Sequence, residues 1–281
     1  MRLGIDLGGT KIEIIALDDA GNESHRHRVP TPHSGYDETI LAIRDLVIGT
    51  ESKLGKKGSV GVAIPGAISP ATGLVKNANS TRLIGHPLDK DLAKALGREV
   101  RVANDANCFT LSEATDGAGK GHDVVFGIIA GTGVGGGVCI GGRVLNGPHA
   151  IAGEWGHNPL PAPRDDELID PPDCYCGKHG CIESWCSGTG LAADHKRVTG
   201  QQLSAPEIAA SDDEAAKQTM QRFYDRFARS IATLVNILDP DAIVLGGGLS
   251  NIDALYTELP PRVERYAFTP QGPSRILKKG N

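Results

Sequence analysis

The chain has little excess charge of either sign. Its 281 residues include 29 Lys and Arg against 34 Asp and Glu, which gives a formal net charge of -5 at pH 7. This slightly acidic balance argues against a surface that binds nucleic acid or another polyanion. No secretory signal is expected, because Met1-Arg2 leads directly into the strand-like residues 3–6. With 40% hydrophobic and 22% charged residues, the composition is typical of a soluble globular protein long enough for two domains.

A membrane-spanning helix is not expected, although residues 124–142 carry no charge and are nearly long enough to cross a bilayer. The run is rich in glycine, and each glycine destabilises a helix interior by about 1 kcal/mol. We therefore predict two buried strands around a glycine turn in this run, and no membrane partner for the chain.

Cysteines are few and unevenly spread, with three of the six inside eight positions. Without a secretion signal, this clustering indicates a reducing cytoplasm and a metal site rather than disulfides. Cys174, Cys176 and Cys181, with His157 upstream, form a Cys3His set that suits tetrahedral zinc better than magnesium or calcium. Four protein ligands leave no position for a catalytic water, so we predict a structural zinc ion. The alternative is ordinary thiols, or one disulfide with spare cysteines.

The predicted zinc loop has two further features. Gly177 and Gly180 permit the tight turns that a metal knuckle needs. Glu154 and Glu183 bracket the loop, so the metal would fix the position of both carboxylates.

The first of two similar glycine turns lies near the N-terminus, where Asp6-Leu7-Gly8-Gly9-Thr10-Lys11 separates two predicted strands. Paired glycines let backbone N–H groups approach an anion closely, because no Cβ blocks the way. Asp6, at the end of its strand, could hold a magnesium ion directly or through water. The alternative is a plain β-turn, since Gly-Gly is a common hairpin connector.

The second glycine turn, Gly131-Thr132-Gly133, again separates two predicted strands. The repetition suggests a duplicated unit that holds nucleotide phosphates between its halves. The alternative is a single flexible hairpin. A third glycine run, at 246–248, follows a buried strand and could admit a base or ribose close to the backbone.

Apolar periodicity predicts the regular elements. Strands are expected at 2–6, 11–17, 23–28, 59–64, 100–103, 124–129, 134–140 and 242–245. Helices are expected at 36–54, 88–96, 108–114, 187–198, 207–210, 214–238 and 252–266.

Two polar segments between these elements are candidates for substrate binding. Asp105 follows a predicted strand and precedes a helix, where a carboxylate can act as a base or cap the helix. The local evidence alone favours capping. Residues 76–81, in a loop rich in amide and hydroxyl side chains, could contact a sugar, or could simply be solvated.

Five motifs follow one another along the chain: Asp-x-Gly-Gly-Thr, Asn-Asp-Ala-Asn, Gly-Thr-Gly, Glu-x-Gly-His with Cys-x-Cys-Gly-x-x-Gly-Cys-x-Glu, and Gly-Gly-Gly. In this order they resemble the ROK family of bacterial sugar kinases, from Met1 to about Asn251. Residues 76–81 and 154–161 are most similar to the fructokinase (mannofructokinase) branch, with N-acetylglucosamine kinases as near neighbours.

The resemblance implies an α/β chain with an actin-like ATPase (ribonuclease H-like, duplicated) fold and an active site in the interdomain cleft. Residues 1–117 would form the sugar and phosphate side, and residues 118–281 would carry the zinc knuckle and the nucleotide-binding glycine turns. Family members usually finish with a final Gly- and Ala-rich helix. Residues 277–281 depart from that pattern, so we expect the tail to be either divergent or truncated, with an effect on domain closure.

The activity implied by the resemblance is transfer of the γ-phosphate of ATP to the C6 hydroxyl of fructose, with mannose and glucose as further candidate acceptors. Asp105 would be the general base, and magnesium and structural zinc the metals. The alternatives are an N-acetylglucosamine or glucose kinase and, in another class, a sugar-responsive repressor. The resemblance also implies a cytoplasmic homodimer without a nucleic-acid partner.

The resemblance assigns the remaining site residues in three sets. ATP and its magnesium would contact Asp6, Gly8, Gly9, Thr10, Lys11, Gly131, Thr132, Gly133, Gly246 and Gly247. Sugar hydroxyls would contact Asn79, Asn104, Asp105, Glu154, His157 and Glu183. Zinc would bind His157, Cys174, Cys176 and Cys181, with one ring nitrogen of His157 on the metal and the other on a hydroxyl.

Overall fold

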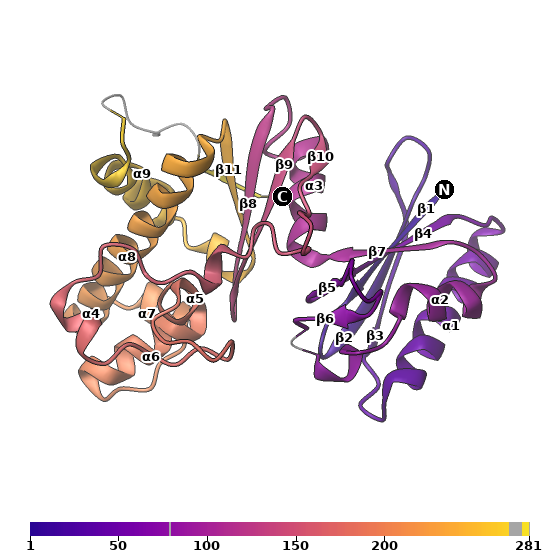
Figure 1. Cartoon of the computed structure of the whole chain (residues 1–281), viewed down its shortest axis with the longest axis horizontal. Coiled ribbons are helices and arrows are strands. Elements are labelled where there is room, and N and C mark those ends of the chain that lie inside the picture. Colours follow the sequence, from indigo (N-terminus) through magenta and orange to yellow (C-terminus); the bar gives the residue numbers. More distant parts are fainter. Residues whose placement is uncertain (79, 270–276, 281) are drawn as a thin grey trace. The chain divides into compact units, whose positions relative to one another are not determined.

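The computed structural model describes residues 1–78, 80–269 and 277–280. The chain divides into two compact units. Unit 1 comprises Met1–Cys108 with Asn146–Ile151, and unit 2 comprises Phe109–Leu145 with Ala152–Asn281. Each unit is built around a five-stranded mixed sheet with helices packed on it (Figure 1).

The sheet of unit 1 has the strand order β3-β2-β1-β4-β7. β1, β2 and β3 pair antiparallel, whereas β4 and β7 continue the sheet parallel to β1. The strands are β1 (Arg2–Leu7), β2 (Lys11–Leu17), β3 (Glu23–Pro30), β4 (Ser59–Ile64) and β7 (Val100–Asn104).

The sheet of unit 2 repeats this pattern in the order β10-β9-β8-β11-β12. β8, β9 and β10 pair antiparallel, and β11 and β12 run parallel to β8. The strands are β8 (Val124–Ala130), β9 (Val134–Ile140), β10 (Arg143–Val144), β11 (Ala242–Gly246) and β12 (Leu277–Lys279). The prediction of a duplicated strand–turn–strand unit is confirmed, and so are two strands in the uncharged run 124–142.

Alternation of side chains explains why one face of the first sheet is buried. Leu3, Ile5 and Leu7 of β1 point to the same side and belong to one apolar cluster. Ile43 and Val47, one helical turn apart on α1 (Tyr36–Leu54), are buried in that cluster as well. α2 (Leu88–Leu96) covers the same core. Shorter elements complete the unit: β5 (Ala67–Ile68), β6 (Val75–Lys76) and η1 (Thr81–Leu83).

The second sheet is covered on both faces (Figure 1). α3 (Asp105–Thr115) lies on one face, where Phe109 packs against a cluster that includes Val125 and Cys139. α8 (Glu214–Leu238) and α9 (Leu255–Tyr266) pack on the other. Because Phe109 packs on this sheet, most of α3 belongs to unit 2, and the division falls earlier than the boundary expected after residue 117.

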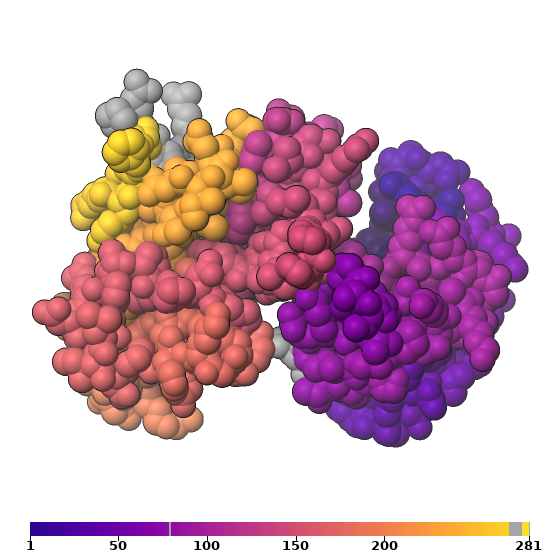
Figure 2. All heavy atoms as spheres, in the orientation of Figure 1, coloured from indigo at the N-terminus to yellow at the C-terminus, as the bar shows by residue number. Residues whose placement is uncertain are grey.

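The long helices begin and end close to their predicted residues, since their apolar periodicity is a local property. The other helices of unit 2 are α4 (Asp165–Ile169), α5 (Ile182–Cys186), α6 (Gly188–Thr199) and α7 (Ala205–Ala210), with η2 (Trp155–His157) and η3 (Gly248–Asn251). Figure 2 draws the atoms of these elements as spheres in the same orientation. No helix within the described residues combines the length and the apolar character that crossing a membrane requires.

A buried ionic cluster fixes α4 to α8. The Glu167 carboxylate, 4% exposed, accepts hydrogen bonds from Arg226 Nε at 2.7 Å and from Arg229 Nη2 at 2.7 and 2.9 Å. The backbone N–H of Arg164 also donates to it. Burial alone would raise the pKa of Glu167, but these donors outweigh it, and the pKa is lowered.

We expect Glu167→Gln to lower the free energy of unfolding of unit 2 by about 3 kcal/mol, because two buried guanidinium groups lose an anionic partner. Since the folded-state pKa is the lower one, the stabilisation is fully present above the ordinary carboxyl pKa and is lost as the pH falls below it. Urea denaturation measures the difference. Glu23→Gln, which breaks an exposed pair with Arg26, is the control with a much smaller expected loss. Equal losses would contradict the interpretation.

Candidate functional site

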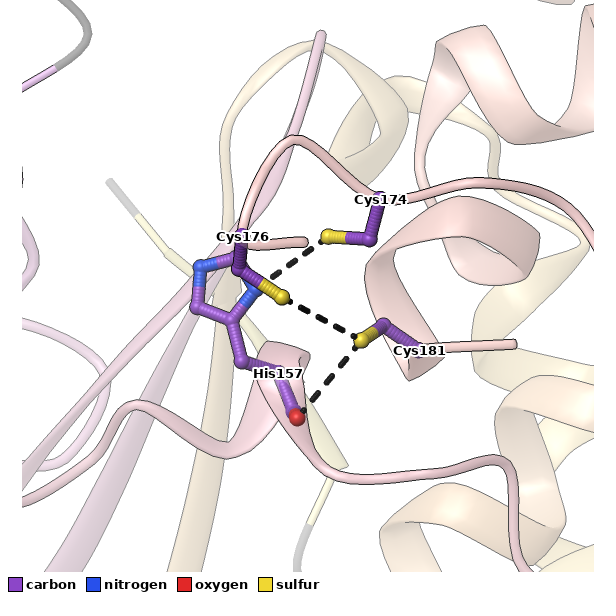
Figure 3. A group of neighbouring side chains, drawn as sticks. All are labelled: His157, Cys174, Cys176 and Cys181. Atoms are coloured by element: carbon purple, nitrogen blue, oxygen red, sulfur yellow. Dashed lines mark hydrogen bonds between the residues drawn. The ribbon is translucent and has the colours of Figure 1, made fainter. Parts of the chain in front are cut away.

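The three clustered cysteines and the upstream histidine converge in unit 2 (Figure 3). One ligand atom from each of His157, Cys174, Cys176 and Cys181 lies within 4.8 Å of all the others. His157 Nδ1 is 3.5 Å from Cys174 Sγ, and Cys176 Sγ is 3.7 Å from Cys181 Sγ. The cysteines are free thiols at these separations, so the disulfide alternative is wrong.

These separations suit a zinc ion. Zinc–sulfur bonds of about 2.3 Å in a tetrahedron place two sulfur atoms about 3.8 Å apart. The distance between Cys176 Sγ and Cys181 Sγ is 3.7 Å. The set of three thiolates and one imidazole favours zinc over hard cations. The four residues named from the sequence are thus brought together in an arrangement that can hold structural zinc.

Trp155 anchors the histidine segment to the second sheet. Its ring is 4% exposed and stacks on Phe227, with centroids 6.2 Å apart. Its Nε1 donates to the carbonyl of Gly135 on β9. The chain approaches β9 closely here, because a Cβ on Gly153 would lie 2.4 Å from the carbonyl oxygen of Gly136. Glu154 and His157 are therefore positioned by the sheet as well as by the metal knuckle.

Both carboxylates that bracket the knuckle lie near Tyr175. Desolvation by surrounding protein atoms raises the pKa of Tyr175, although its side chain is exposed, and the Glu183 and Glu154 carboxylates raise the pKa further. The Tyr175 hydroxyl is 3.0 Å from His157 Nε2, while His157 Nδ1 faces Cys174. One ring nitrogen of His157 thus faces a cysteine of the metal cluster, and the other faces the Tyr175 hydroxyl. The predicted contact of the second nitrogen with a sugar hydroxyl stays a prediction.

Asp105 stands at the start of α3, directly after β7. Its Oδ1 accepts from the N–H of Ala106 at 2.8 Å. Asn104 caps the helix, because its Oδ1 accepts from the N–H of Asn107 while its Nδ2 donates to the carbonyl of Gly66. Asn104 therefore supplies one cap at the start of this helix, beside the bond that Asp105 accepts from Ala106.

Asp6 and Asp105 share one neighbourhood in unit 1. Burial raises the pKa of Cys108 to about 11, and the carboxylates of Asp105 and Asp6 add to this effect. Desolvation by surrounding protein atoms raises the pKa of Asp6 itself, with a further contribution from Glu13, although the side chain remains accessible. An acidic group in this position fits a magnesium ion, which would favour its charged form.

The first glycine turn (residues 8–10) closes on itself. The N–H of Gly8 donates to the carbonyl of Lys11, and Thr31 donates through its hydroxyl to the carbonyl of Gly8. The prediction of anion binding at this turn therefore depends on the N–H groups of Gly9 and Thr10. Asn79, predicted to contact the sugar, lies outside the described residues.

The second glycine turn (residues 131–133) closes in a similar way, with the N–H of Gly131 donating to the carbonyl of Gly133. A cavity of about 920 Å³ opens beside it within unit 2. Its volume suits a nucleoside, and its wall consists mainly of small and apolar residues. It is lined by Gly131, Thr132, Gly188, Thr189, Ala192, Ser204, Ala205, Pro206, Ala209, Ala210, Gly248, Leu249, Asn251, Ile252, Asp253 and Ala254.

Only part of the wall of this cavity was predicted from the sequence. Gly131 and Thr132 were predicted to contact a nucleotide, whereas the contributions of α6 and α7 were missed. The small residues of α7 are the sequence feature that could have indicated its place in the cavity wall. Gly246 and Gly247, also predicted to line ATP, have a packing explanation: a Cβ on Gly246 would lie 2.5 Å from the Phe109 ring, and one on Gly247 would lie 2.5 Å from the carbonyl oxygen of Ala130.

The sequence profile of the ROK family matches residues 2–279. The N-acetyl-D-glucosamine kinase of Pectobacterium atrosepticum is 41% identical over 283 residues, which cover 99% of this chain and 90% of that protein.

Two solved structures share the fold. The ROK hexokinase from Thermus thermophilus superposes with a TM-score of 0.85 at 29% identity, covering 100% of this chain and 92% of the other. The ROK family glucokinase from Streptomyces griseus, in complex with glucose and AMPPNP, gives 0.79 at 26% identity, with coverages of 99% and 94%. The expected actin-like ATPase fold of two α/β domains is confirmed.

Proposed function

This chain belongs to the ROK family and is an ATP-dependent sugar kinase, and on that basis we propose that it phosphorylates N-acetyl-D-glucosamine. The observation that carries the choice of sugar is 41% identity to a kinase of that name over 99% of the chain. The sequence motifs favoured fructose, with N-acetylglucosamine as the alternative. The comparisons support the alternative better than the fructose interpretation.

Asp105 is the general base in this proposal. Its carboxylate would take the proton from the C6 hydroxyl of the sugar as that oxygen attacks the γ-phosphorus of ATP. Two features support this role: its place at the end of a parallel strand and the start of a helix, and the fact that Asn104 supplies a cap to that helix. Asp6 would hold magnesium, which neutralises phosphate charge when bound.

The remaining sugar contacts are assigned to the knuckle and its surroundings. Glu154 and Glu183 would accept hydrogen bonds from sugar hydroxyls, and His157 would contribute its Nε2 in place of its contact with the Tyr175 hydroxyl. The clustering of both carboxylates around Tyr175 supports the assignment. Asn104 keeps capacity for one further donor and one further acceptor bond, because each of its amide atoms makes one hydrogen bond to another residue that the structure describes.

The nucleotide is assigned to unit 2. The cavity beside the second glycine turn would hold the base and ribose, and the N–H groups of Thr132 and Gly133 would face phosphate oxygens. The small side chains of α7 and the backbone of η3 leave room for a flat ring against the wall. The role of Gly8, Gly9, Thr10 and Lys11 in phosphate binding stays a prediction.

A panel of sugars tests the substrate. We expect kcat/KM for N-acetyl-D-glucosamine to exceed that for glucose, mannose and fructose by about tenfold or more, measured as sugar-dependent ADP release. A site that hydrogen-bonds an acetamido group leaves buried polar groups unpaired when that group is missing. Fructose as the best substrate would refute the assignment and restore the fructokinase interpretation.

A further inference from the structure

The second glycine turn is held by the segment that follows the metal knuckle. Glu183, two residues after Cys181, accepts a hydrogen bond at its Oε2 from the N–H of Val134, with a distance of 2.8 Å. Val134 is the first residue of β9 and directly follows the turn. One predicted sugar ligand therefore also contacts the backbone of the residue that directly follows the predicted phosphate-binding turn.

Two more hydrogen bonds tie the same segment to the turn. The N–H of Gly188 donates to the carbonyl of Gly131 at 2.7 Å, and the hydroxyl of Thr189 donates to the carbonyl of Thr132 at 2.7 Å. Both donors lie at the start of α6, which follows α5 with one residue between them. The turn is thus fixed by backbone and side-chain donors from α6 and by the Glu183 acceptor from α5.

At Gly133, the contact between Glu183 and the backbone leaves no space for a side chain. A Cβ there would lie 2.5 Å from Glu183 Oε2 and 3.3 Å from its Cδ, and both atoms belong to the same carboxylate. Within the described residues, no atom other than these two and the chain neighbours lies within 4 Å of that Cβ. The backbone of Gly133 is outside the left-handed region, so alanine fits its conformation.

We propose that Glu183 is a positioning residue for the nucleotide, which fixes the second glycine turn in the conformation that binds phosphate. The inference rests on the proposed function, in which that turn contacts ATP. A turn ordered in advance does not lose conformational entropy when the nucleotide binds, so its affinity is higher. The carboxylate has two oxygens, so Oε1 can still accept from a sugar hydroxyl while Oε2 holds Val134.

The measurement is binding of AMPPNP with magnesium to the full chain by calorimetry, without any sugar. We expect Glu183→Ala to weaken binding about tenfold, the effect of losing one hydrogen bond to a charged acceptor. Glu183→Gln keeps an acceptor oxygen of the same reach and should bind within about twofold of the wild type. A residue that serves only the sugar would leave AMPPNP binding unchanged in both variants, and that result would overturn the inference.

A double-mutant cycle isolates the contact itself. Gly133→Ala should weaken AMPPNP binding about tenfold, because its methyl group displaces the carboxylate. In the Glu183→Ala background the same change should cost little, since the two atoms that it would meet are gone. Additive losses would refute the role of Glu183.

Two controls keep the outcomes distinct. Zinc content and the melting temperature of each variant show whether the knuckle is intact. If Glu183→Ala loses zinc or unfolds, the Gly133→Ala variant becomes the test of the inference. Wild-type affinity of that variant for AMPPNP would overturn the inference. Failure of the wild type to bind AMPPNP would instead refute the proposed function.

Discussion

Asp105→Asn should lower kcat by roughly 10²–10⁴-fold and leave sugar binding nearly unchanged. The amide has the shape of the carboxylate and can still accept from the N–H of Ala106 through its oxygen, so the start of α3 is kept. It cannot take a proton from the attacking hydroxyl at neutral pH. The sugar-dependent ADP-release assay gives kcat, and calorimetry with the sugar alone gives its dissociation constant.

Asp116→Asn is the matched control, because Asp116 is an exposed residue just beyond the other end of α3. It should leave both quantities unchanged. A loss of kcat and sugar affinity together in Asp105→Asn would indicate that Asp105 mainly binds the substrate. Near-normal turnover would remove Asp105 from the mechanism and transfer the role of base to another group.

Local signals predicted most of the fold. α1, α2 and α8 match the predicted residues because three- and four-residue apolar spacing determines which face a helix buries. The glycine turns between antiparallel strands could be predicted equally well from the sequence. β12 was missed, because its short Leu-Lys-Lys sequence is polar and is a strand only through parallel pairing with β11. α4 was also missed, since its burial depends on Glu167 meeting two arginines of a distant helix.

The residues of the candidate site likewise include some that the sequence predicts and some that it does not. The metal ligands could be named from the sequence, because the type and number of ligands, three thiolates and one imidazole, together with the nearby glycines, indicate a zinc site. The contact between Glu183 and Val134 could not be, since it joins residues 49 positions apart and depends on how α5 lies beside β9. Tyr175 was not singled out, because nothing in its position between two cysteines indicates a contact with His157.

Zinc should be essential to the structure of the knuckle, so Cys181→Ser is expected to lose the metal and with it almost all activity. Cys181 is 1% exposed and precedes α5, the helix that carries Glu183, so its loss affects both the metal site and the predicted sugar contacts. Structural zinc contributes about 10–16 kcal/mol in small zinc-dependent domains, far more than a loop can replace. Elemental analysis gives the metal content, and the ADP-release assay gives the activity.

Cys139→Ala is the control, because Cys139 is a buried thiol of the same unit that lies outside the ligand set. It should keep zinc and activity, whereas Cys181→Ser should also melt at a lower temperature. Prolonged treatment of the wild type with a strong chelator should reproduce the Cys181→Ser phenotype. Zinc that binds only the folded protein stabilises the fold, so removing the zinc removes that stabilisation. Fully active wild-type protein without zinc would contradict a structural metal, and the positions of Glu154 and Glu183 would then depend on Trp155 and the glycine-rich strand β9 alone.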